Sequence, residues 1–171
     1  AIVSNEDELR ANLIYSDIRL INFSCDISLT QKLVIYRKDI IIDGHGYKLV
    51  LEDETGWQGN YIIQAYDTTG VVLKNIIFHG GDAAILINGS ELTVSNLTLI
   101  GQEYGGIELS KGVGIISSPS LTIESSITAS YTSIPVIWTD KLNEYGFEGV
   151  HCFVEYDYND NQVWYVNSNQ I

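Results

Sequence analysis

The histidines and the acidic residues in glycine-rich turns are the first candidates for catalysis. His45 lies in Gly44-His45-Gly46, and His79 begins His79-Gly80-Gly81-Asp82. A glycoside hydrolase needs a pair of carboxyl groups flanking the bond that it breaks. Asp82 is followed by two alanines rather than by a second acid. Because glycines supply the positive φ that tight turns need, we interpret His45 as a turn residue rather than a catalytic one.

Other catalytic arrangements are also missing from the sequence. A polysaccharide lyase needs clustered carboxylates that hold Ca²⁺ and a nearby basic side chain, but Arg37 and Lys38 are neighbours and would face opposite sides of a strand. There is no Gly-x-Ser-x-Gly motif, the three histidines lack metal-ligand spacing, and Cys152 directly follows His151. We predict no catalytic residues and no enzyme. The alternative is a polysaccharide lyase or glycoside hydrolase that acts on an acidic polysaccharide.

Two aromatic residues beside glycines are the best candidates for binding a ligand. Trp57 lies in the segment Gly56-Trp57-Gln58-Gly59-Asn60, and Tyr104 precedes Gly105-Gly106. Exposed aromatic faces stack on sugar rings, and nearby carboxylates or amides bond the hydroxyl groups. The pattern predicts a carbohydrate-binding role for Trp57 and Tyr104. The competing interpretation is that both rings pack on their own part of the fold.

Acidic loops raise the question of a bound metal. Asp157, Asn159 and Asp160 supply hard oxygen ligands in one loop, and Glu52-Asp53-Glu54 does so in another. Neither segment matches a complete calcium loop, and solvated acidic loops have the same composition. We predict no cofactor, with Ca²⁺ at Asp157, Asn159 and Asp160 as the weaker alternative.

Charge and cysteine content narrow the classes of partner and the compartment. The formal net charge of −13 in 171 residues disfavours nucleic acid and anionic membranes, and no apolar run is long enough to cross a bilayer. An inhibitor that mimics an anionic ligand is a third class consistent with this acidity. Cys25 and Cys152 are too few for a disulfide scaffold, and they are either free thiols or one bridge. Because methionine is absent, we expect that a leader or a tag was removed, which fits secretion.

The elements that must position these residues are one helix followed by many short strands. The segment from Ser4 to Leu13 predicts a helix with Ser4 or Asn5 as N-cap. From Ile18 onward short β-branched runs lie between turn residues, which predicts strands. These runs are Leu33–Tyr36, Ile40–Ile42, Lys48–Leu51, Tyr61–Gln64, Val71–Leu73, Ile85–Ile87 and Leu121–Ile123.

A degenerate repeat suggests how the strands are arranged. A small polar residue followed by an aliphatic one recurs five times, and aligning Lys38–Gly44 with Lys74–Gly80 gives one of the matches. Stacked copies would place the polar positions in one structural ladder, formed by Asp17, Asp39, Asn75, Asn96 and Ser126. The repeat predicts an all-β fold, a right-handed single-stranded parallel β-helix with an N-terminal capping helix and a C-terminal aromatic-rich capping segment. An antiparallel sandwich or barrel is the competing architecture.

Four segments resemble a known family. Val3–Leu9, Ile40–Leu49, Gly101–Ile107 and Ile134–Asp140 are similar to the pectate-lyase-like β-helix modules of Firmicutes cell-surface proteins. The chain length, the first helix, the repeat and the aromatic-rich tail predict a single domain over residues 1–171, with an N-terminal cap at 1–15, coils at 16–130 and a C-terminal cap at 131–171. In that cap, Phe153–Tyr156 and Val163–Val166 are predicted to form a hairpin.

The functional expectation combines these points. We predict a non-catalytic, extracellular or cell-surface module that acts as an adhesin or a spacer and binds a glycan or a surface protein. It is expected to bind neither nucleic acid nor membrane, and to be a monomeric part of a longer surface protein.

Overall fold

The structure is a computed structural model that describes residues 1–15, 17–52, 55–131 and 134–139, and the backbone of 152–156 and 162–166. Its one described helix is α1 (Glu6–Ile14). The strands are β1 (Ile2–Val3), β2 (Leu20–Phe23), β3 (Ile27–Leu29), β4 (Leu33–Ile35), β5 (Ile40–Asp43), β6 (Lys48–Leu51), β7 (Tyr61–Tyr66), β8 (Val71–Gly80), β9 (Ala83–Asn88), β10 (Glu91–Ile100), β11 (Gly105–Ser110), β12 (Ser120–Ile123), β13 (Ser126–Ala129), β14 (Ile137–Trp138), β15 (Cys152–Tyr156) and β16 (Gln162–Val166).

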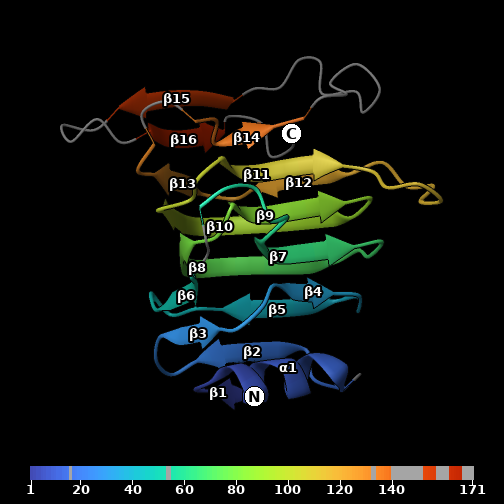
Figure 1. The fold of residues 1–171 in the computed structure, drawn as a ribbon. Coiled ribbons are helices and arrows are strands. Elements are labelled where there is room, and N and C mark those ends of the chain that lie inside the picture. The colour runs from blue at the N-terminus through green and yellow to red at the C-terminus, as the bar shows by residue number, and fades with distance from the viewer. Residues whose placement is uncertain (16, 53–54, 132–133, 140–151, 157–161, 167–171) are drawn as a thin grey trace.

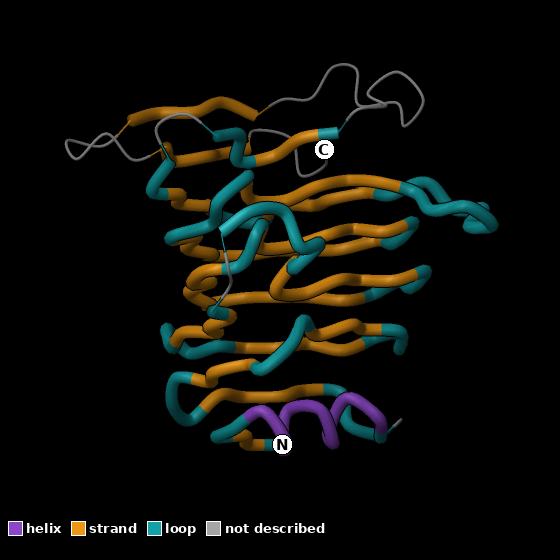
Figure 2. The backbone as a smooth tube through the Cα atoms, viewed as in Figure 1, coloured by secondary structure: helices purple, strands orange, loops and turns teal. Residues whose placement is uncertain are grey.

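The strands form two mainly parallel sheets that face each other across the core (Figure 1). The eleven-stranded sheet has the order β1-β2-β5-β8-β10-β13-β16-β15, with β3, β6 and β12 paired to its members. The five-stranded sheet has the order β14-β11-β9-β7-β4. Successive strands alternate between the sheets from β7 to β11, and Figure 2 shows loops at both margins of the stack.

The predicted fold class is wrong. The chain is not plainly all-β, because it includes α1, and its strands make two hydrogen-bonded parallel sheets rather than the predicted single-stranded right-handed β-helix. The eleven-stranded sheet also ends in antiparallel pairs, β13 with β16 and β16 with β15. The physical reason is that a repeated polar and aliphatic signature indicates which strands can lie side by side but carries no information on how they divide between sheets.

Helix α1 follows from its first residues, as the sequence predicts. Asn5 is the N-cap, and its side-chain oxygen accepts a 2.9 Å hydrogen bond from the Glu8 backbone N–H. The Glu8 carboxylate accepts hydrogen bonds in return from the backbone N–H and the hydroxyl of Ser4, at 2.6 and 2.9 Å. These bonds satisfy donors that would otherwise lack partners at a helix start. Leu9 is the fully buried residue of the helix and packs into the core.

The core is built from inward residues that lie in register on successive strands. In the eleven-stranded sheet, Ile42 lies opposite Leu73, and Leu73 lies opposite Val94. In the five-stranded sheet, Ala65 lies opposite Ile87. All five are fully buried. Parallel strands covered on their inner face can bury such columns continuously, which is why the predicted strand segments are confirmed.

The polar ladder is continuous over part of its predicted length. Asn96 lies opposite Asn75 and also opposite Ser126, as the flanking pairs of β10 with β8 and β13 show. The Asn96 side-chain NH₂ donates to the Asn75 side-chain oxygen at 2.9 Å, and the Asn75 NH₂ donates to Asp43 at 3.0 Å. Both asparagines have left-handed backbone, with φ of 55° and 52°, where this residue type is well tolerated.

The prediction that Asp39 and Asp17 belong to the ladder is wrong. Ile40 pairs with Val71, so Asp39 lies beside Gly70 and not beside Asn75. Asp17 precedes the first paired residue of β2. The short apolar run around Ile40 fits several offsets equally well, and the inward packing against Val71 selects one of them.

Asp43 accepts hydrogen bonds at the end of the observed ladder. It is nearly buried and accepts hydrogen bonds from the Asn75 side chain and from the His45 backbone N–H at 2.9 Å, with the Lys74 ammonium 3.6 Å away. Burial raises the pKa of this carboxyl, but those hydrogen bonds and the electrostatic attraction of the His45 ring and the Lys74 ammonium outweigh it and leave the pKa below the ordinary value. His45 has a φ of 51°, as expected of a turn residue, and its ring meets the Asn22 side chain at 2.7 Å.

The predicted C-terminal hairpin is confirmed in its backbone, because β15 pairs with β16 in antiparallel register. Cys25 is a free thiol that donates to the Ser4 carbonyl oxygen at 3.1 Å. No helix among the described residues is long and apolar enough to cross a membrane.

Candidate functional site

Three aromatic rings gather beside the starts of β7 and β11. Trp57, Tyr61 and Tyr104 form what we call the Trp57 cluster, in which the Trp57 ring centroid lies 5.5 Å from that of Tyr61 and 5.2 Å from that of Tyr104. Both pairs are nearly perpendicular, at 84° and 80°. This edge-to-face geometry is favourable for aromatic pairs. Trp57 is 51% exposed and Tyr104 38% exposed, whereas Tyr61 is buried. The structure thus brings together the two ligand-binding candidates, Trp57 and Tyr104.

The loop that carries Trp57 is fixed to the sheet by two carboxylates. It joins β6 to β7 and crosses the stack toward neighbouring layers in Figures 1 and 2. One carboxylate oxygen of Asp82 accepts hydrogen bonds from the backbone N–H groups of Gln58 and Asn60, at 2.7 and 2.9 Å. The Glu103 carboxylate accepts from the Gly56 N–H at 3.1 and 3.2 Å. These bonds lie on both sides of Trp57 and hold its backbone in place.

Asp82 is completely buried beneath this loop. Its second carboxylate oxygen has no hydrogen-bond partner among the described residues. A buried carboxylate is costly unless its oxygens are paired, so the two loop N–H groups are the compensation that the described structure provides. Asp82 therefore serves to position the Trp57 loop.

Tyr61 connects the Trp57 cluster to the outer face of the five-stranded sheet. Its hydroxyl donates a hydrogen bond to the Glu108 carboxylate of β11. Burial, the hydrogen bond to Glu108 and the negative charges of Glu108 and Asp82 all raise the pKa of the Tyr61 hydroxyl. Tyr61 consequently stays protonated in neutral solution and remains a donor to Glu108.

A polar pocket of about 230 Å³ adjoins the loop that carries Trp57. Its lining is Leu51, Glu52, Thr55, His79, Gly80, Gly81, Gly101 and Glu103. The described residues include no group of three His, Cys, Asp or Glu side chains placed to hold a metal ion. Asp157, Asn159 and Asp160, the predicted calcium ligands, lie outside the described residues. The pocket thus offers hydrogen-bonding groups beside the loop that carries Trp57, because Thr55 lines it and Glu103 bonds the Gly56 N–H.

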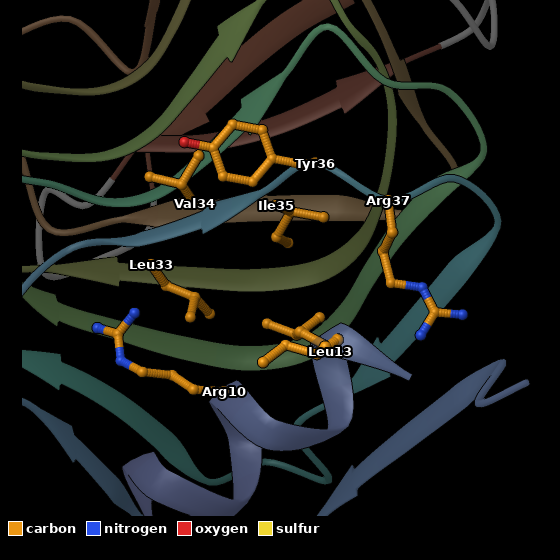
Figure 3. Close-up of a pocket in the computed structure, with 8 residues that line it drawn as sticks. Arg10, Leu13, Leu33, Val34, Ile35, Tyr36 and Arg37 are labelled. Atoms are coloured by element: carbon orange, nitrogen blue, oxygen red, sulfur yellow. The ribbon is translucent and has the colours of Figure 1, made fainter. Parts of the chain in front are cut away.

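A second cavity, of about 470 Å³, lies between α1 and β4 (Figure 3). Leu13 of α1 and Leu33 and Ile35 of β4 face it, with Arg10 and Arg37 at its two sides. Arg10 donates to the Gln31 carbonyl oxygen at 2.6 Å, and Arg37 donates to the carbonyl oxygens of Tyr15 and Ile18. Arg10 thus ties α1 to the segment before β4, Arg37 bonds the carbonyls that follow α1, and the cavity lies where the helix is attached to the sheet.

Sequence reasoning missed three residues of the site. The sequence predicts Tyr61 only as the start of a strand, offers Asp82 only as an isolated acid, and does not single out Glu108. The usable signal was the composition of their segments: Tyr61 directly follows the glycine-rich Trp57 loop, and Glu108 is the one acid within β11. The hydrogen bond between Tyr61 and Glu108 joins β7 to β11 across β9, and no local sequence pattern predicts such a contact.

The pectate-lyase-like resemblance has no independent support. Comparison of the chain with protein-family models, with curated proteins and with solved structures finds no match to any of them.

Proposed function

We propose that this chain is a non-catalytic carbohydrate-binding module that binds its ligand through the Trp57 cluster. The observation that carries the proposal is that the Trp57 ring is half exposed yet held by two perpendicular tyrosine rings. An exposed apolar ring with a fixed orientation is suited to stack on the apolar face of a sugar. Because the ring is ordered before the ligand arrives, binding loses little side-chain entropy.

Polar groups next to the rings support the same proposal. Sugars present hydroxyl groups around an apolar face, so their sites combine an aromatic platform with hydrogen-bonding side chains. Glu52, His79 and Glu103 line the pocket beside the Trp57 loop, and Gln58 is an exposed amide next to Trp57. These side chains are available to select among hydroxyl arrangements.

The carboxylates near the Trp57 cluster accept hydrogen bonds from the protein itself, which favours a binding role over catalysis. Asp82 is buried and bonded to the Trp57 loop, and Glu108 accepts the Tyr61 hydroxyl. A glycoside hydrolase instead needs two carboxyl groups that both reach the scissile bond. Residence outside the cell or on its surface, and an adhesin-like or spacer role there, belong to the same proposal.

A glycan array compared between the intact protein and Trp57→Ala tests the proposal. Loss of a stacked ring worth about 1 kcal/mol should weaken binding about fivefold, and Trp57→Phe should retain part of the affinity. Tyr47→Ala is the matched control, since Tyr47 is also a partly exposed aromatic residue but lies before β6 in the other sheet. Binding to no glycan, or equal binding by Trp57→Ala and the intact protein, would refute a carbohydrate site at the Trp57 cluster.

A further inference from the structure

The outer face of the five-stranded sheet continues beyond the Trp57 cluster as two rows of side chains. One row crosses all five strands in register and consists of Val34, Gln64, Leu86, Glu108 and Trp138. These residues alternate with buried ones on β4, β7, β9 and β11. Side chains that alternate with core residues point away from the core, so this row lies on the outer face. The Tyr61 hydroxyl reaches Glu108, and therefore the Trp57 cluster adjoins the same face.

A second aromatic pair lies at the far end of this face. Tyr36 directly follows β4, Tyr66 ends β7, and their ring centroids are 5.5 Å apart at an interplanar angle of 61°. Figure 3 shows Tyr36 on the opposite side of β4 from Leu33. Tyr36 is 68% exposed and Tyr66 37% exposed. Asn88 and Ser110 continue from Tyr66 in register on β9 and β11.

The two aromatic groups are separated by the length of one strand. Tyr61 and Tyr66 are the first and last residues of β7, and a parallel strand rises about 3.3 Å per residue, so their backbones lie roughly 16 Å apart. That span suits a short stretch of polysaccharide chain and exceeds a single sugar. Polar side chains of Gln64, Asn88 and Ser110 lie next to this path.

Charge restricts which polysaccharide can lie there. Four acidic residues lie at the Trp57 end of the face. Glu103 accepts a hydrogen bond from the Trp57 loop, and Glu108 accepts one from the Tyr61 hydroxyl. Glu52 lines the pocket, and Asp82 is buried beneath the loop. At the other end of the face, the Arg37 guanidinium donates to main-chain carbonyls around α1. With a net charge of −13, the chain repels a polymer that carries carboxylates, most strongly where the ligand meets Trp57.

From this arrangement we infer that the ligand is an extended polysaccharide without carboxylate groups, lying along β7 from Trp57 to the Tyr36–Tyr66 pair. The inference rests on the proposed function and adds the length, direction and charge class of the ligand. The acidic end of the face disfavours uronate polymers.

Binding measurements on oligosaccharides of increasing length test this inference. The probes are neutral β-glucan, mannan and xylan oligomers together with oligogalacturonates, each at low and high salt. We expect the intact protein to bind neutral oligomers with affinity that rises with length, and to bind oligogalacturonates at least tenfold more weakly at low salt. Tyr66→Ala should lower the affinity for long neutral oligomers about fivefold and leave the affinity for the shortest bound oligomer unchanged. Trp57→Ala should lower the affinity for both.

The outcomes separate the two proposals. Trp57-dependent binding of oligogalacturonates as tight as that of neutral oligomers would overturn the charge class and leave the carbohydrate site intact. Trp57-dependent binding with no length-selective effect of Tyr66→Ala would overturn the extended path. Absence of any Trp57-dependent binding would overturn both the inference and the proposed function. Circular dichroism of each variant, matching that of the intact protein, ensures that a loss of binding is not a loss of folding.

Discussion

Replacement of Asn75 by alanine should be among the most destabilising polar substitutions in the described part of this chain. Asn75 lies in the middle of β8 with a φ of 55°, where it donates to Asp43 and accepts from Asn96. Alanine would remove both hydrogen bonds and would have to adopt a left-handed backbone conformation. Glycine at the same position would remove the hydrogen bonds but adopt that conformation freely.

The expected magnitudes follow from these two effects. A side-chain hydrogen bond contributes about 0.5–1.5 kcal/mol, and one to a charged group about 1.5–3 kcal/mol, so losing both bonds costs roughly 2–4 kcal/mol. The left-handed conformation adds about 1–2 kcal/mol for alanine. Glycine forgoes most of that cost but loses some stability through its flexible unfolded state. We therefore expect Asn75→Gly to lose roughly 2–4 kcal/mol and Asn75→Ala about 1 kcal/mol more.

Urea unfolding followed by tryptophan fluorescence measures both variants against the intact protein. An unchanged slope of free energy against urea would show that the variants share the native compactness, so that a shift in midpoint reports stability. If both variants unfold within about 0.5 kcal/mol of the intact protein, the ladder contributes no stability and the reasoning fails. If Asn75→Ala is no less stable than Asn75→Gly, the left-handed backbone costs alanine no more than the stability that glycine loses through its unfolded state, and the expected difference of about 1 kcal/mol is wrong.

Two further predictions concern the same fold. Because the native pKa of Asp43 is below its unfolded value of about 3.9, Asp43 stabilises the fold above that pH, and this contribution is lost as the pH falls through the native pKa. The free energy of unfolding should thus fall less steeply with decreasing pH in Asp43→Asn than in the intact protein. An identical pH dependence in the two proteins would contradict this role of Asp43. Gly89→Ala should lower the midpoint of thermal unfolding by several degrees, since a β-carbon there would lie 2.2 Å from Ile115 at a φ of 56°. Gly114→Ala is the control, with a left-handed φ of 86° but no atom within 4 Å of the added carbon, and an equal effect of both would show that steric conflict with Ile115 is irrelevant.

The sequence by itself determined the local elements. The N-cap and acidic first turn of α1, the apolar strand segments and the glycine-flanked turn at His45 depend on residues close together in the chain. The register of Asn75 with Asn96 was also predictable, because both sit at the same place in two long and similar apolar runs. Trp57 was recognisable as a candidate because glycines flank it in a loop.

Only the tertiary structure decided the arrangement of those elements. The division of strands into two sheets, and the pairing of Ile40 with Val71 that separates Asp39 from the ladder, depend on how whole layers pack. The same is true of the contact between Trp57 and Tyr104 and the bond from Tyr61 to Glu108, which join residues from different strand layers. Local periodicity reports which side of a strand is apolar, whereas these neighbours are fixed by the stacking of layers distant in sequence.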